Sequence, residues 1–215
     1  NNMLPPSRDR ENLSNSLDLL DLPGSIAWNG KIAFLDRDGV INKGYDNYVN
    51  NINEINILPH AGESIARLRR AGFRICVVTN QSPIGRGIWT HENLWIIHEH
   101  ISKLLLIEDN DSVLDLILYS PYAPWEGAWA RKPNPGMLEA GRQIIDHAHR
   151  EDSSKLKIYY DNAWTNRPDE SESIMIGDRN VDYLAAQSYG VNFLKCDPNI
   201  GIYDVISSVL GDEDE

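Results

Sequence analysis

Residues 31–40 read KIAFLDRDGV, an apolar run that ends abruptly in two aspartates one residue apart, Asp36 and Asp38. Such a run predicts a strand buried in a parallel sheet, and Gly39 lets the chain turn sharply where the strand ends. Two neighbouring carboxylates are costly to hold together unless a cation neutralises them. Because the sites of open α/β sheets lie beyond the carboxyl ends of strands, this stretch indicates a functional site rather than a solvated turn.

The composition narrows the class of protein. The chain has 215 residues, of which 41% are hydrophobic and 24% charged, and this suits a globular protein with one sizeable core. The net charge of −12, with no run rich in Lys and Arg, makes long nucleic acid an unexpected partner. Two cysteines, Cys76 and Cys196, form neither a disulfide framework nor a zinc quartet.

The sequence also carries expectations about location and assembly. No apolar stretch is long enough to cross a membrane, and residues 1–30 lack the basic start and apolar middle of a signal peptide. We therefore expect a cytoplasmic protein with no membrane partner, and we expect it to be a monomer.

Strand-like and helix-like segments alternate along the chain. This alternation predicts an α/β fold of the doubly wound, Rossmann type, with helices on both faces of a parallel sheet. The strands are expected at 31–35, 73–79, 113–119, 173–176 and 191–195, and the helices at 60–71, 90–107, 135–149, 181–189 and 202–210.

Three regions fall outside this alternating pattern. Residues 1–30 are expected to be an N-terminal extension, in which a leucine cluster at 13–22 predicts a short helix ended by Pro23-Gly24. Residues 31–210 are expected to form the α/β domain, and 211–215 a disordered acidic tail. Two connections, at 120–134 and 151–172, are long enough that a functional role is expected for them.

Four strand ends carry polar groups of complementary chemistry. They are Asp36-Arg37-Asp38-Gly39, Thr79-Asn80-Gln81-Ser82, Arg131-Lys132-Pro133, and Gly177-Asp178-Arg179-Asn180 with Asp182 on the next helix. Each motif alone is compatible with an ordinary cap, turn or surface pair. Together they supply a carboxylate nucleophile, a carboxylate acid and base, an oxygen ligand for Mg²⁺, and a hydroxyl and an ammonium group for phosphate oxygens. The set therefore indicates phosphoryl transfer.

The order DRDGV, TNQS, RKPNPGM and GDRNVD resembles the haloacid dehalogenase superfamily of phosphatases, over roughly residues 31–195. Within it, TNQSPIGRG and RKPNPGM resemble the D-glycero-D-manno-heptose 1,7-bisphosphate phosphatase and histidinol-phosphate phosphatase group. The stretch IGRG also resembles polynucleotide 3′-phosphatases. The resemblance implies a minimal cap with no separate cap domain, so that loops decide specificity.

The resemblance further implies a Mg²⁺-dependent phosphomonoester hydrolase that acts through an aspartyl-phosphate. The expected substrate is a small phosphate ester, best a phosphorylated sugar such as heptose 1,7-bisphosphate. Histidinol phosphate and a nucleic-acid 3′-phosphate are the alternatives. Asp36 would attack phosphorus, and Asp38 would protonate the leaving oxygen and then activate water. Asp36, Asp38 through its main-chain carbonyl, and Asp178 would bind the metal ion.

The remaining matched positions are implied to hold the substrate or to support the site. The resemblance implies phosphate or substrate binding by Thr79, Asn80, Gln81, Arg131 and Lys132, and support from the surroundings by Arg179 and Asp182. The planar fork of Arg131 suits a second phosphate. Asp182 would orient Lys132 or a metal-bound water, or would simply be a favourable charge at a helix start.

The chain departs from the family pattern in two places. Many relatives carry Cys-x-His and Cys-x-Cys in a zinc-bound loop, where residues 120–122 and 128–130 here read SPY and AWA. With all four ligands absent, no structural zinc is expected, and aromatic packing is a candidate for stiffening the loop. The insertion at 151–172 is either a surface elaboration, or a lid or a partner surface. These departures leave open a non-catalytic phospho-ligand binding protein on the same fold.

Overall fold

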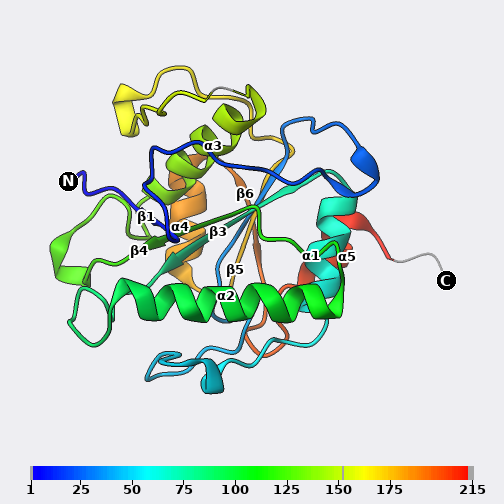
Figure 1. Ribbon diagram of the computed structural model, residues 1–215, viewed down its shortest axis with the longest axis horizontal. Helices are drawn as coiled ribbons and strands as arrows, with labels where there is room; N and C mark the ends of the chain where they lie inside the picture. The colour runs from blue at the N-terminus through cyan, green and yellow to red at the C-terminus, as the bar shows by residue number, and fades with distance from the viewer. Residues whose placement is uncertain (1, 152, 213–215) are drawn as a thin grey trace.

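The computed structural model of the protein describes residues 2–151 and 153–212. Within these residues one sheet has the strand order β1-β4-β3-β2-β5-β6 (Figure 1). Its strands are β1 (Ser7–Arg8), β2 (Ile32–Leu35), β3 (Arg74–Asn80), β4 (Leu116–Ser120), β5 (Ile174–Gly177) and β6 (Asn192–Lys195). Strands β2 to β6 pair in parallel, as predicted, with Leu35 opposite both Val77 and Ile176.

Helices cover both faces of the sheet, which confirms the doubly wound arrangement. They are α1 (Ala61–Arg70), α2 (His91–Glu108), α3 (Gly136–His149), α4 (Asn180–Tyr189) and α5 (Tyr203–Leu210). Because side chains alternate along a strand, Ala33 and Leu35 pack with α1, α2 and α5, whereas Ile32 and Phe34 pack with α3 and α4. Among the described helices, none has the length and apolar character that a membrane crossing requires.

The helix boundaries follow local signals that the sequence already contains. The Thr90 hydroxyl accepts a hydrogen bond from the Asn93 amide at 3.3 Å and so caps the start of α2. Gly72 and Gly190 follow the ends of α1 and α4 with φ of +97° and +98°, the left-handed conformation that glycine adopts without strain. Between β2 and α1 the described chain holds only the short turn η2 (Ile52–Glu54), so no separate cap domain is present.

The N-terminal segment contradicts the prediction of a short helix. Residues 16–22 have no regular structure, and Pro23 begins the 3-10 turn η1 (Pro23–Ser25) instead of ending a helix. The physical reason is that backbone carbonyls of this segment form hydrogen bonds with distant residues instead of with a helix. The Leu20 carbonyl accepts from Arg74 Nη1 at 2.6 Å, and the Ser14 carbonyl accepts from the Leu156 amide. Leu13 and Leu17 are half-buried against the core, Leu22 is buried, and Leu20 is exposed.

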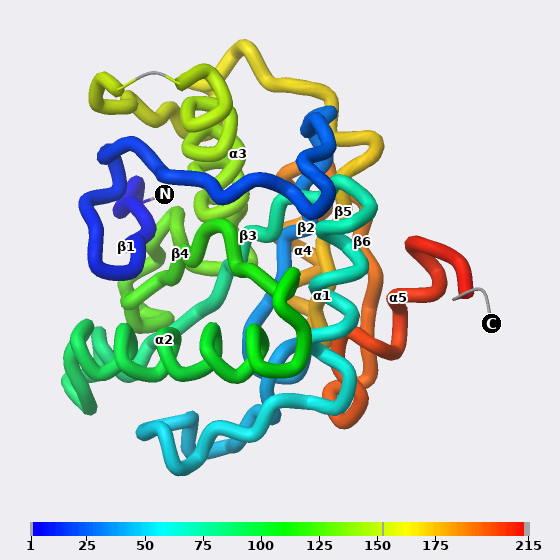
Figure 2. Tube along the Cα trace, turned by 45° about the vertical axis from the view of Figure 1, so that its right-hand side comes forward, coloured from blue at the N-terminus to red at the C-terminus, as the bar shows by residue number. Residues whose placement is uncertain are grey.

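Residues 2–30 pack against the α/β domain rather than away from it. Figure 2 shows this segment in blue, running from beside β4 toward the start of β2. Strand β1 pairs antiparallel with β4, Ser7 opposite Tyr119, which adds an edge strand that the sequence did not predict. The acidic tail expected at 211–215 lies largely outside the described residues, which end at Asp212.

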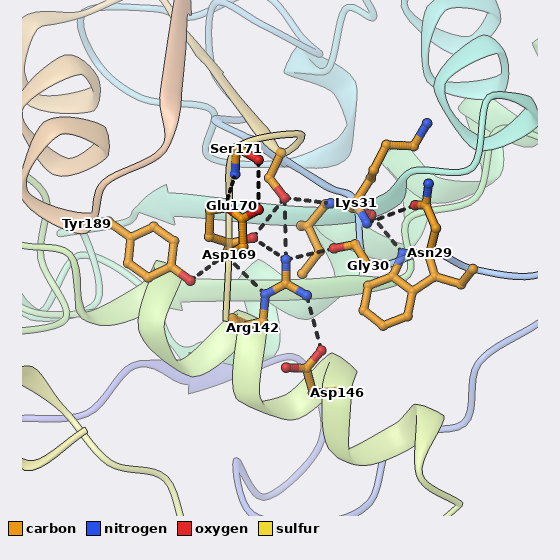
Figure 3. A network of polar contacts seen from close by, with 12 residues as sticks. Asn29, Gly30, Lys31, Arg142, Asp146, Asp169, Glu170, Ser171 and Tyr189 are labelled. Carbon is orange, nitrogen blue, oxygen red and sulfur yellow. Dashed lines mark hydrogen bonds and ion pairs between the residues drawn. The ribbon is translucent and has the colours of Figure 1, made fainter. Parts of the chain in front are cut away.

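The long connection after α3 packs along that helix. Its described part holds only the turn η4 (Asp161–Ala163), and Trp164 is buried and stacked on Tyr189 of α4. At its far end, Glu170 is bound by the buried Arg142 side chain of α3, which also donates to the Gly30 carbonyl at 2.7 Å (Figure 3). The connection is therefore anchored to α4 through Trp164 and to α3 through Glu170.

Candidate active site

The predicted motifs meet at the carboxyl ends of β2, β3 and β5 and at the loop before α3. A cleft of about 710 Å³ opens there. Its lining includes Asp38, Asn80, Gln81, Arg131, Asp178 and Arg179, together with Lys43, Tyr45, Tyr48 and Arg86. The parallel strands bring these residues together because their carboxyl ends meet at one edge of the sheet.

Lys132 bridges two buried carboxylates next to the cleft, directly after the cleft-lining residue Arg131. Its Nζ lies 2.9 Å from Oδ1 of Asp36 and 2.6 Å from Oδ1 of Asp182. Burial would lower the pKa of Lys132, but the two carboxylates outweigh it and raise the pKa above its ordinary value. Asn80 holds the Lys132 backbone by two hydrogen bonds of 3.0 Å, one to the carbonyl and one from the amide, just before the cis peptide bond to Pro133. The lysine is thus held at its backbone by Asn80 and at its ammonium group by the two carboxylates.

Three carboxylates converge beside this lysine. Oxygen atoms of Asp36, Asp178 and Asp182 all lie within 4.8 Å of one another. Burial and the charge of Asp182 raise the pKa of Asp36 to about 7, although the Lys132 ammonium opposes the shift. The same two causes raise the pKa of Asp178. The cluster carries more negative charge than the one lysine neutralises, so a further cation is favoured there.

An unpaired oxygen of Asp178 indicates where that cation would bind. Its Oδ1 atom is buried and has no hydrogen-bond partner within the described residues. A Cβ atom on Gly39 would lie 2.4 Å from the other Asp178 oxygen, so only glycine fits between the strand-end turn and this carboxylate. Buried polar atoms are rarely left unpaired, and oxygen ligands suit Mg²⁺. The residues present therefore fit a magnesium ion.

Asp182 has both of the roles that the sequence left as alternatives. One of its oxygens accepts from Lys132, and the other accepts from the Arg179 amide at 3.1 Å at the start of α4. A Cβ atom on Gly177 would lie 2.4 Å from the Cβ of Asp182, so the strand end must be glycine for the two segments to approach. Asp182 joins the lysine to the helix start.

Asp38 lies in a different environment from Asp36. Its side chain is 36% exposed toward the cleft, against 9% for Asp36. Its Oδ1 accepts from Arg37 Nη2 at 2.8 Å and from Asn42 Nδ2 at 2.9 Å. Burial raises the pKa of Asp38, but the charge and hydrogen bond of Arg37, helped by Asn42 and Gln81, hold it below its ordinary value. Its carboxylate is not part of the three-carboxylate cluster.

Thr79 and Gln81 connect the end of β3 to this acid. Gln81 Nε2 donates to the Thr79 hydroxyl oxygen at 2.9 Å and to Oδ2 of Asp38 at 3.2 Å. Both side chains are buried. The structure thus brings together all of the residues that the sequence selected around Asp36 and Asp38.

The rim of the cleft is basic although the chain as a whole is acidic. Arg86, Arg131 and Arg179 all line the cleft, and burial, followed by the charges of Arg86 and Arg179, lowers the pKa of Arg131. The Arg131 side chain is steadied by a hydrogen bond of 3.3 Å to the Tyr122 carbonyl. The sequence reasoning did not select Arg86 or Lys43. Arg86 lies within the TNQSPIGRG stretch, and its place on that motif is the signal that was available.

The loop at 120–134 is braced by polar and aromatic contacts. Trp129 is buried, and its Nε1 donates to Oε1 of the fully buried Glu139 at 2.6 Å. The other Glu139 oxygen accepts from the Asp161 amide at 2.8 Å and from Arg167, both in the long connection after α3. Because none of residues 153–172 lines the cleft, this connection supports the loop from behind rather than covering the site.

Several known proteins are similar to this chain. The HAD-hydrolase-like family model matches residues 129–195. A D-glycero-D-manno-heptose-1,7-bisphosphate 7-phosphatase from Chlorobaculum tepidum is 32% identical over 170 residues, 76% of each chain. A probable enzyme of the same name from Thermoplasma volcanium is 33% identical over 150 residues, 70% of this chain and 86% of its own. The Pseudomonas aeruginosa D-glycero-beta-D-manno-heptose-1,7-bisphosphate 7-phosphatase is 40% identical, but the match spans only 62% of that protein and 54% of this chain.

Two solved structures share the fold. The D,D-heptose 1,7-bisphosphate phosphatase of B. bronchiseptica, complexed with magnesium and phosphate, has a TM-score of 0.61 and 27% identity. The match covers 84% of this chain and 98% of that one. A putative HAD-like phosphatase from Mesorhizobium loti has a TM-score of 0.62 and 27% identity, with 86% and 80% covered.

Proposed function

This chain belongs to the haloacid dehalogenase-like family of hydrolases, and we propose that it is a Mg²⁺-dependent phosphomonoesterase acting on a phosphorylated sugar. The observation that carries the proposal is the placement of Lys132 between Asp36 and Asp182, beside the unpaired oxygen of Asp178. A lysine, a carboxylate nucleophile and a cation site would then surround the transferred phosphoryl group at the carboxyl ends of the strands.

Asp36 is the proposed nucleophile. One carboxylate oxygen forms a bond to phosphorus while the bond between phosphorus and the ester oxygen breaks, giving an aspartyl-phosphate. Lys132 and Thr79 hold the phosphoryl oxygens as negative charge shifts in the transition state. Asp36, Asp178 and the Asp38 main chain would hold Mg²⁺, which would supply charge neutralisation and a fixed orientation for the phosphoryl group.

Asp38 is the proposed acid and base. It gives a proton to the leaving oxygen in the first step, and in the second it takes a proton from the water whose oxygen attacks phosphorus and releases Asp36. The Arg37 contact keeps Asp38 ionised at rest, which suits the second step. The negative charge of bound phosphate raises the pKa of this carboxyl and so favours the protonated form that the first step needs.

The basic rim supports a substrate with a second phosphate. Arg86, Arg131 and Arg179 all line the cleft, and among the described residues no carboxylate forms an ion pair with any of their guanidinium groups. Their planar donors match phosphate geometry. The names of the relatives point in the same direction, and we propose a heptose bisphosphate or a similar sugar bisphosphate, from which one phosphate is released.

Release of inorganic phosphate across a panel of esters tests the proposal. The panel contains heptose 1,7-bisphosphate, hexose bisphosphates, histidinol phosphate and a 3′-phosphorylated oligonucleotide, each with Mg²⁺ and with EDTA. We expect the sugar bisphosphates to be the best substrates, and only with Mg²⁺. The Asp36→Asn variant should release no phosphate while it keeps its fold, and Asp18→Asn, an exposed aspartate, is the matched control.

Different outcomes separate the alternatives. Preference for histidinol phosphate or the oligonucleotide would keep the chemistry and replace the substrate. Tight binding of Mg²⁺ and phosphate with no turnover of any ester would identify a non-catalytic binding protein. Substantial activity in Asp36→Asn would show that the nucleophile is wrongly assigned.

A further inference from the structure

We propose that Asp9, in the N-terminal segment, is a positioning residue for the acid–base carboxyl of Asp38 and acts through His98 and Arg37. This inference rests on the proposed function, because it assigns a supporting role in the same reaction. The sequence resemblance begins near residue 31, so this role belongs to a part of the chain outside the four motifs.

A continuous series of polar contacts joins the two aspartates. Both oxygens of Asp9 lie within hydrogen-bond distance of His98 Nδ1, at 2.9 and 3.0 Å. The other ring nitrogen, Nε2, lies 3.1 Å from Arg37 Nη1. The second terminal nitrogen of Arg37 donates to Asp38 Oδ1 at 2.8 Å. Each contact is made by a different atom, so all three can exist at once.

The middle of the series is shielded from water. The side chains of His98 and Arg37 are each 2% exposed, and that of Asp9 is 17% exposed. A buried guanidinium with a wrong or missing partner is costly, so its orientation is closely tied to the groups that hold it. Water therefore does not easily take the place of the buried His98 ring beside this guanidinium.

The chemistry of arginine determines the direction of every hydrogen bond. A guanidinium has donors only, so His98 Nε2 must accept. The proton of the ring is then on Nδ1, where it donates to Asp9. Asp9 therefore selects the tautomer and the ring orientation in which His98 can receive Arg37. Without Asp9, the ring loses the partner that fixes its rotation.

The same property shows that the series positions groups and does not move protons. Arginine is not deprotonated in proteins, so no proton passes between Asp38 and His98 through it. The series instead fixes the orientation of the Asp38 carboxylate. Arg37 donates to one of its oxygens, and Gln81 donates to the other at 3.2 Å. The carboxyl is thereby turned toward the cleft, where it must meet the leaving oxygen.

Strand β1 explains how Asp9 reaches this position. Arg8 pairs with Leu118 of β4, and the Asp9 amide then donates to the Ile117 carbonyl at 3.4 Å. The residues that follow this edge strand, Asp9 and Arg10, are thereby placed beside α2, which carries His98. The adjacent Arg10 makes an ion pair with Glu99 of the same helix at 2.8 Å. This exposed pair joins the same two segments without touching Arg37 and offers a matched control.

The experiment compares Asp9→Ala, Asp9→Asn and the control Glu99→Gln. Each variant is assayed with the sugar phosphate that the wild type hydrolyses fastest and with p-nitrophenyl phosphate, whose leaving group needs little help from an acid. For Asp9→Ala we expect kcat for the sugar phosphate to fall about tenfold and KM to stay unchanged. A fall in rate of this size is within the range that follows when a catalytic group is misplaced. The fall with p-nitrophenyl phosphate should be smaller.

The other variants complete the test. Asp9→Asn keeps an oxygen acceptor for His98 Nδ1 and should retain most of kcat, and Glu99→Gln should match the wild type. Equal losses on both substrates, or a fall only in the unfolding temperature, would overturn the positioning role and leave the phosphatase proposal intact. A wild type without activity on any ester would overturn both, and that result is visible before any variant is made.

Discussion

The Nζ atom of Lys132 and the Oδ1 atom of Asp36 face each other at 2.9 Å, both buried, and Oδ1 of Asp182 lies 2.6 Å from the same Nζ. The lysine comes from the loop before α3 and the two carboxylates from the ends of β2 and the start of α4. Because one cation faces three clustered carboxylates, charge balance governs both the stability and the chemistry of this site.

The Lys132→Met variant removes the charge and keeps the length of the side chain. It leaves Asp36 and Asp182 buried without their cation, and breaking a buried pair costs about 3–5 kcal/mol. We expect turnover to be lost and the unfolding temperature to fall, less so in Mg²⁺ than in EDTA, because the metal neutralises the same carboxylates. Calorimetry in both buffers measures this, with Lys103→Met on the surface of α2 as control. An equal fall in both buffers would contradict the shared site.

Stability without metal should depend on pH through Asp36. Burial and the charge of Asp182 raise its pKa to about 7, whereas in the unfolded chain it titrates near pH 4. Between these values the folded state binds more protons than the unfolded state, so stability falls as pH rises. We expect the unfolding temperature in EDTA to drop between about pH 5 and pH 7. The lowered pKa of Asp38 acts only below this window.

Asp36→Asn should make this slope shallower, whereas Asp18→Asn should leave it unchanged. Saturating Mg²⁺ should abolish it, because the metal binds the ionised carboxylates and competes with the proton. An undiminished slope in Asp36→Asn would assign the effect to another group.

The buried Glu139 should support activity from behind the site. Glu139→Ala removes the acceptor of the Trp129 indole and of the Asp161 amide. Each buried donor left unpaired costs about 1–3 kcal/mol. Because the Trp129 loop carries Arg131 and Lys132, we expect kcat/KM to fall together with the unfolding temperature. The exposed Glu172→Ala variant is the control, and unchanged kinetics in Glu139→Ala would show that the loop does not need this support.

The purified protein should hold no zinc in this loop. Positions 120, 122, 128 and 130 carry Ser, Tyr, Ala and Ala, which offer no thiolate or imidazole. Elemental analysis should therefore find no stoichiometric zinc, and a zinc-selective chelator should leave the unfolding temperature unchanged. Zinc at one equivalent per chain, lost with a fall in stability, would contradict this.

Arg142 should matter for stability and not for chemistry. Its guanidinium is buried among Glu170, Gly30 and Asp146, as Figure 3 shows, and none of these lines the cleft. Arg142→Met should cost about 3–5 kcal/mol because Glu170 is left buried without its cation. Arg70 makes two surface ion pairs, with Asp109 and Asp111, each worth at most about 1 kcal/mol, so Arg70→Met is the control. Denaturant unfolding measures both, and a changed kcat in Arg142→Met would contradict the separation.

The alternation of strands and helices, and the placement of Asp36, Thr79, Lys132 and Asp178 at one sheet edge, could be predicted from the sequence. Apolar runs, glycine turns and the Thr90 cap are local signals, and parallel strands bring their carboxyl ends together whatever lies between them. The leucine cluster at 13–22 does not form the predicted helix, because its backbone is held by hydrogen bonds to Arg74 and Leu156. These partners are distant in sequence, so no local pattern indicates them.

The order and spacing of residues along the chain were enough to show which residue types serve the site and on which strand ends they lie. The pairing of β1 with β4, the gathering of Arg86, Arg131 and Arg179 around one cleft, and the contact of Asp9 with His98 depend instead on how the elements pack. Residues 9 and 98 are far apart in sequence, and their meeting depends on packing between an edge strand and a helix. Contacts of that kind are set by the burial of shared surface, which leaves no periodic trace in the chain.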